Sequence, residues 1–182
     1  MDKRIVYTRH DGGVSICTPT DWIVSALCNG GGIWDHLPPG VMDRQIASMV
    51  KRGVRADAAH RYAKAAMFGG CTTAEALEII RDRDCAHLGT AIELWDASEV
   101  PTDRWFRDAW RRSHNGGPIS VSLDLAKPIQ IQRIGEAVIV ENRKRERELM
   151  VPLDYDRDLL RGKVMSARDE IELRQIWPKE LQ

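Results

Sequence analysis

Two β-prone runs flank a tight-turn sequence at the start of the chain. The runs are residues 4–9 and 14–17, and the turn sequence His-Asp-Gly-Gly occupies residues 10–13. Asp followed by glycine suits a hairpin turn, because glycine adopts positive φ without a steric penalty. The pattern predicts an antiparallel hairpin and therefore favours a fold that contains a sheet. In this interpretation His10 and Asp11 are turn residues rather than a catalytic pair.

Four segments with apolar residues at helical spacing follow the hairpin. Thr72 and Glu75 have the spacing of a capping box at the start of the last segment. A glycine-rich run at residues 29–32 has no preceding strand and lacks the Gly-Lys-Ser/Thr sequence of a phosphate loop. We therefore interpret this run as the end of a helix. The predicted helices cover residues 18–27, 42–52, 55–68 and 72–83.

The second half of the chain combines two short alternating segments with two long helical ones. Residues 90–95 and 119–123 alternate like half-buried strands, and residues 124–150 and 154–176 predict two helices joined by a tight break. The predicted fold class is α+β, with short antiparallel strands packed on helices and a C-terminal antiparallel helical hairpin. We expect an α+β body over residues 1–123 and the hairpin over 124–182. A wholly helical alternative would require both alternating segments to be loops.

Composition excludes several classes of protein. Lys and Arg total 27, as do Asp and Glu, and a dedicated nucleic-acid binder usually carries a basic excess. No run approaches the roughly 18 apolar residues of a membrane span, and no apolar signal region follows the N-terminus. The cysteines lack Cys-x-x-Cys spacing, so we expect reduced thiols, no bound metal and no cofactor. They are Cys17, Cys28, Cys71 and Cys85.

Aromatic and arginine residues alternate in the segment 103–112, which supplies the candidate binding residues. On a helix, Phe106 and Trp110 would share one face, while Arg107 and Arg111 would form a second ridge and Trp105 would point elsewhere. Trp and Arg are enriched at protein-binding hot spots, and aromatic rings also stack on single-stranded nucleic acid. The competing interpretation is that Phe106 and Trp110 fill the core between the sheet and the helical hairpin.

Two segments resemble small uncharacterised proteins of bacterial prophages. The first is the hairpin, with Tyr7, Arg9 and residues 11–15, and the second is residues 102–110, which contain Phe-Arg-Asp-Ala-Trp before a helical C-terminus. The resemblance covers about half of the chain and carries no catalytic residue with it. It implies a phage gene product in the cytoplasm of the bacterial host, with association with the virion as a second location.

Three functional hypotheses are consistent with these patterns. The first is a non-enzymatic phage accessory or assembly protein that acts by contact with a virion or assembly component. The second is a host-defence antagonist, such as an anti-CRISPR-type inhibitor, that binds a bacterial immune complex. The third is a hydrolase or nuclease whose site is assembled only in the fold, although no catalytic motif is present. Its site would need histidines to converge with carboxylates, from among His10, His36, His60, His87 and His114.

A narrow apolar stripe in the C-terminal hairpin predicts self-association. Leu160, Val164, Ala167 and Ile171 recur at helical spacing, and apolar residues become sparse after Val138 toward the end of the preceding helix. We expect the tip of the hairpin to project and to need a partner. A homodimer through the hairpin would supply one, since two-fold dimers are the commonest oligomers.

Overall fold

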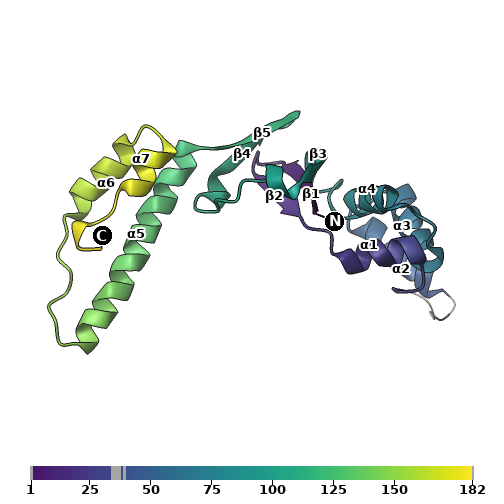
Figure 1. Ribbon diagram of the computed structural model, residues 1–182, viewed down its shortest axis with the longest axis horizontal. Helices are drawn as coiled ribbons and strands as arrows, with labels where there is room; N and C mark the ends of the chain where they lie inside the picture. Colours follow the sequence, from purple (N-terminus) through teal and green to yellow (C-terminus); the bar gives the residue numbers. More distant parts are fainter. Residues whose placement is uncertain (1, 34–37, 39, 182) are drawn as a thin grey trace. The chain divides into compact units, whose positions relative to one another are not determined.

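The chain forms two compact units, described here from a computed structural model that covers residues 2–33, 38 and 40–181 (Figure 1). The N-terminal unit contains Met1–Thr102 and Arg112–Ile119, and the C-terminal unit contains Asp103–Arg111 and Ser120–Gln182. The packing thus assigns residues 103–111 to the C-terminal helices, whereas the sequence pattern places them in the body.

A three-stranded antiparallel sheet, of order β2-β1-β3, forms part of the N-terminal unit. The strands are β1 (Lys3–Arg9), β2 (Val14–Cys17) and β3 (Gly89–Asp96), which confirms the hairpin and the first alternating segment. Within the turn, Gly12 has a φ of 78° and the Asp11 carboxylate accepts a 2.8 Å hydrogen bond from the Gly13 backbone N–H. Asp11 is therefore a structural residue of the hairpin turn.

Four helices complete the N-terminal unit and share one apolar core with the sheet (Figure 1). Small residues lie in the centre of this core: Ala59, Ala63 and Ala66 on the third helix are almost fully buried. Their small side chains allow close helix packing. All four predicted helices are confirmed, with small differences at their ends. They are α1 (Asp21–Asn29), α2 (Val41–Lys51), α3 (Ala56–Phe68) and α4 (Thr73–Asp84).

The glycine-rich ends of α1 and α3 meet backbone to backbone. A Cβ atom on Gly30 would lie 2.5 Å from the Phe68 carbonyl carbon, and one on Gly69 would lie 2.5 Å from the Gly30 nitrogen. Both glycines also have positive φ, at 73° and 66°. These glycines permit a close helix contact, in agreement with their interpretation as helix ends.

Thr72 and Glu75 form the predicted capping box at the start of α4. The Thr72 hydroxyl accepts from the Glu75 backbone N–H at 3.3 Å, and the Glu75 carboxylate accepts from the Thr72 backbone N–H at 2.8 Å. We expect Thr72→Ala to lower the free energy of unfolding by about 1 kcal/mol, because it leaves a helix N–H without its protein partner. Urea denaturation measures the difference, and Thr73→Ala at the adjacent position should change it by less than about 0.5 kcal/mol.

The same capping box makes the effect of Thr72→Ala depend on pH. Hydrogen bonds from the Thr72 backbone and hydroxyl lower the pKa of Glu75 below its ordinary value of 4.5. A carboxyl group with a lowered folded-state pKa stabilises the protein above its unfolded-state pKa and loses that contribution as the pH falls through the folded-state value. Thr72→Ala removes the part of this effect that comes from the hydroxyl, so the difference between wild type and variant should shrink as the pH falls through the lowered folded-state pKa of Glu75. A difference independent of pH would exclude the hydrogen bond from the Thr72 hydroxyl to the Glu75 carboxylate as a source of the effect.

A two-stranded ribbon, β4 (Trp110–Ser113) and β5 (Gly116–Val121), follows two short 3-10 turns, η1 (Ala97–Glu99) and η2 (Arg107–Ala109). The predicted second alternating segment thus forms a strand. Arg112 anchors the part of the ribbon that belongs to the N-terminal unit, residues 112–119. Its guanidinium donates to the Gly117 carbonyl at 2.7 Å and to the Ala91 carbonyl at 2.9 Å, and it forms an ion pair with Glu93.

The C-terminal unit packs three helices around a separate apolar core. The helix α5 (Leu123–Arg147) matches the first predicted long helix, and α6 (Arg157–Ser166) runs back along it (Figure 1). The prediction of one second helix over 154–176 is wrong, because α7 (Glu170–Gln175) is separate. The Asp169 carboxylate accepts from the Glu172 N–H at 2.8 Å and caps a new helix there. The last short element is η3 (Lys179–Leu181).

The α+β fold class is confirmed: short antiparallel sheets accompany seven helices in the parts of the chain that the structure describes. Within the same residues, no helix combines the length and the apolar character that a membrane span requires.

Candidate functional site

The aromatic and arginine segment is not an α-helix, so the helical arrangement considered for its side chains does not occur. Its regular structure is limited to η2, and Trp110 is already extended, with φ −63° and ψ 133°, at the start of β4. The Asp103 carboxylate accepts from the Trp105 N–H at 2.9 Å and bends the chain before this turn. Phe106 and Trp110 therefore do not share a helix face, which corrects the geometry expected from their spacing.

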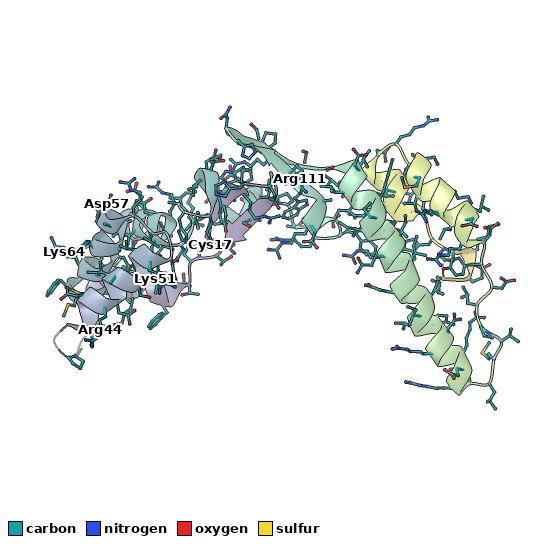
Figure 2. All side chains as sticks on the ribbon, turned by 180° about the vertical axis from the view of Figure 1, so that it is seen from behind. Cys17, Arg44, Lys51, Asp57, Lys64 and Arg111 are labelled. Carbon is teal, nitrogen blue, oxygen red and sulfur yellow. The ribbon has the colours of Figure 1, made fainter. Side chains whose placement is uncertain are left out.

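The structure places the five candidate binding residues in different environments. Phe106 is 1% exposed within the C-terminal core, and Trp110 is 3% exposed with the Arg104 guanidinium 5.0 Å from its ring centroid. Arg107 is exposed, whereas Arg111 (labelled in Figure 2) is half-buried and donates to the Trp110 carbonyl at 2.7 Å. The buried members of the set therefore fill the interior, and Arg107 is the member that is open to solvent.

Trp105 belongs to an internal polar and aromatic joint of the C-terminal unit. Its Nε1–H donates to the Gln130 side chain at 3.0 Å, and this fully buried amide donates to the Ile176 carbonyl at 3.0 Å. The Arg133 guanidinium lies 4.5 Å from the Trp105 ring centroid, and the Trp177 ring meets Trp105 edge to face at 6.1 Å. These contacts connect the segment to α5 and the chain end, which gives Trp105 a structural role.

A nearby ion pair fixes the same joint to α7. Arg174 pairs with both Asp103 and Glu170, and its guanidinium lies 5.7 Å from the Trp105 ring centroid. The hydrogen bond from the Trp105 backbone N–H, followed by the Arg174 interactions, lowers the pKa of Asp103. The carboxylate is therefore held in its charged form as part of the joint.

An apolar groove between α5 and α6 offers a more open surface in the C-terminal unit. We call it the α5–α6 groove; it encloses about 260 Å³. Arg157 and Arg161, one helical turn apart on α6, line the groove and are exposed. Within the described residues neither arginine has an ion pair or a side-chain hydrogen bond. The apolar lining includes Ile131, Ile134, Val138, Ile139, Leu160 and Val164.

Exposed apolar side chains continue from this groove to the end of α5. We call them the apolar tip: Ile139, Val140, Leu149, Met150 and Val151. Leu149 is 96% exposed, and Val151 is 80% exposed. Ile139 lines both the groove and a second hollow that includes Leu149 and Met150, so the two surfaces are continuous. Contiguous exposed apolar surface of this kind marks interaction sites in soluble proteins.

The stripe predicted for a dimer is largely interior. Val164 and Ala167 are buried, and Leu160 packs against the same core, whereas Ile171 is 71% exposed. Leu160, Val164 and Ala167 therefore stabilise the C-terminal unit itself, and Ile171 is the member of the stripe that is open to solvent. In the sequence, the tip was indicated by the loss of apolar periodicity after Val138. The apolar run Leu149-Met150-Val151 is a second signal for it.

The described histidines do not converge on one site. His10, His60 and His114 are exposed, and His87 lines a cavity of about 190 Å³ with Asp84, Arg52 and Arg83. His36 lies outside the described residues. Among residues 2–33, 38 and 40–181, no group of three His, Cys, Asp or Glu side chains has an arrangement suited to a metal ion.

Comparisons with known protein families, with curated protein sequences and with solved structures find no match.

Proposed function

We propose that this chain is a non-enzymatic phage accessory or assembly protein that acts by protein–protein contact through the α5–α6 groove and the apolar tip. The observation that carries the proposal is the continuity of the two surfaces through Ile139. Exposed apolar side chains beside an apolar groove lose contact with water when a partner covers them, and this provides a driving force for association.

The groove favours an amphipathic helix as the occupant. It lies between two helices, and a third helix can place apolar side chains along it at i, i+3 and i+4 spacing. The unpaired charges of Arg157 and Arg161 at the groove favour carboxylates on the flank of that helix, because charge-assisted bonds to arginine can be bidentate. The partner that we propose is an acidic amphipathic segment of a virion or assembly component.

Photo-crosslinking from the groove tests the proposal. A photoreactive amino acid in place of Ile139, in host cells during phage production, should crosslink to a virion or assembly protein, identified by mass spectrometry. The same amino acid in place of Phe68, which is 69% exposed in the N-terminal unit, should not produce this crosslink. The adduct on the partner should map to a segment with acidic residues beside an apolar helical face.

Charge reversal in the groove gives the quantitative prediction. R157E/R161E should reduce the yield of the Ile139 crosslink at least about tenfold, because two favourable interactions with carboxylates become repulsive. The matched variant K163E/R168E makes the same change of charge elsewhere in α6 and just after it, and should stay within about twofold of wild type. An equal loss in both variants would overturn the role of the groove arginines.

The identity of the crosslinked protein separates the remaining interpretations. A host immune complex would replace the assembly role with that of a host-defence antagonist, and a crosslink to a second copy would establish the homodimer. Crosslinks that are insensitive to R157E/R161E, or the lack of any crosslink specific to Ile139, would overturn the proposal.

A further inference from the structure

A small polar cavity lies where the turn that joins α2 to α3 meets the end of α4. It encloses about 190 Å³, and its lining belongs to the N-terminal unit: Arg52, Val54, Arg83, Asp84 and His87. The volume exceeds the roughly 30 Å³ that one water molecule occupies in the liquid, so the cavity can admit a small polyatomic ligand. All lining side chains except Val54 are polar or charged, which favours a charged ligand over an apolar one.

Arg83 and Asp84 form a two-point ion pair in the wall of this cavity. The Arg83 Nε and Nη2 atoms donate to the two Asp84 carboxylate oxygens, at 2.6 Å each. The guanidinium also lies 3.9 Å from the Tyr62 ring centroid, and the Arg83 side chain is 18% exposed, so the pair is held in place. The two charges compensate each other. Each carboxylate oxygen has a second lone pair, with which Asp84 can accept a hydrogen bond from a ligand.

Arg52 and His87 supply donors to the cavity. Arg52 is exposed, and within the residues that the structure describes its side chain has no ion pair or hydrogen bond. The His87 Nδ1 atom is buried without a hydrogen-bond partner among the same residues, so Nε2 is the nitrogen through which the ring can bond a ligand. A Cβ atom on Gly53 would lie 3.6 Å from the His87 Cδ2 atom, so the turn that carries Arg52 lies beside the ring. Because Arg83 and Asp84 compensate each other, Arg52 gives the cavity a net positive charge.

We propose that this cavity binds a phosphate group that carries a proton, either as inorganic phosphate or on a phosphate monoester. The Arg52 guanidinium pairs with two phosphate oxygens, and the His87 Nε2–H donates to a third. The protonated oxygen donates to the Asp84 carboxylate. This last bond makes the site selective, because the carboxylate repels an anion that has no proton to share, such as sulfate. The site is separate from the α5–α6 groove, which belongs to the other unit.

Amide NMR spectra of the full chain, recorded at about pH 7 and constant ionic strength, test the proposal. Inorganic phosphate should shift the amide signals of residues 52–54 and 83–87 in a saturable way. Its dissociation constant should be at least about tenfold lower than that of sulfate, because sulfate and Asp84 repel each other. O-phosphoserine is the probe for a monoester. The same shifts with phosphate alone would assign the site to the free ion, and the same shifts with both probes would extend it to phosphate esters.

Matched variants test the individual contacts. R52Q should weaken phosphate binding at least about tenfold, because it removes a bidentate, charge-assisted contact. R44Q should change the affinity by less than about twofold, since Arg44 (labelled in Figure 2) is an exposed arginine of α2 outside the lining of the cavity. D84N removes the negative charge that repels sulfate, so the preference for phosphate over sulfate should fall to about threefold or less.

Three results would overturn the proposal. They are equal affinities of the wild type for phosphate and sulfate, equal losses of affinity in R52Q and R44Q, and shifts that leave residues 52–54 and 83–87 unaffected. Circular dichroism and the unfolding temperature establish that each variant is folded. D84N breaks the ion pair with Arg83, and R52Q, which keeps that pair, provides the decisive comparison if D84N does not fold.

Discussion

Phe106→Ala is expected to lower the free energy of unfolding of the C-terminal unit by about 3–5 kcal/mol, the usual range for loss of a buried phenylalanine. The side chain is 1% exposed and lies in a core with Ile134, Val138 and Leu173. Truncation removes apolar contacts and leaves a cavity, because helices on several sides prevent full collapse. Hydrogen exchange of the α5 amides measures the loss within this unit.

A matched substitution separates core from interface in the same segment. Arg107 is the exposed neighbour of Phe106, so Arg107→Ala should change α5 protection by less than about 0.5 kcal/mol. If Phe106→Ala left α5 protection intact but abolished the Ile139 crosslink to the partner, Phe106 would be an interface residue and the core assignment would fail.

Arg112→Ala is expected to cost the N-terminal unit about 3 kcal/mol. The guanidinium side chain has no exposed surface, lies 4.9 Å from the Trp95 ring centroid, and bonds two carbonyl oxygens and Glu93. Its removal breaks these hydrogen bonds, and bonds made by a charged group contribute about 1.5–3 kcal/mol each; water recovers part of this at the exposed Gly117. Hydrogen exchange of the β3 and β5 amides reports the loss.

Lysine and a neighbouring arginine provide the controls for this prediction. Arg112→Lys keeps the charge but lacks the planar group that reaches three acceptors, so it should recover less than half of the lost stability. Arg111 lies on the same strand, and within the part of the chain that the structure describes its side chain bonds only to the carbonyls of Trp110 and Asp108. Arg111→Ala should therefore cost less than about 1 kcal/mol. Equal losses for Arg111→Ala and Arg112→Ala would contradict the assigned role.

The elements predicted correctly are those with local signals. The opening hairpin depends on the Asp-Gly turn, and α4 depends on Thr72 and Glu75, all within a few residues of the structure that they determine. Apolar periodicity identified α2, α3 and α5, because the residues of one buried helix face recur every three or four positions and are therefore a local signal.

Long-range contacts explain what the sequence did not predict. Phe106 and Trp110 have helical spacing, but contacts of Trp105 with Gln130 and Arg133, which are distant in sequence, favour a non-helical conformation of this segment. The α5–α6 groove depends on the separation of two helices, which periodicity does not encode.

The division of the β4–β5 ribbon has a consequence for dissecting the protein genetically. The chain passes between its compact units three times, after Thr102, after Arg111 and after Ile119. No single stop codon or start codon can therefore yield one complete unit free of the other. A fragment ending at residue 123 would keep 103–111 without α5 and leave Phe106 uncovered, so a soluble N-terminal half requires a graft: residues 1–102 rejoined by a short linker to 112–119.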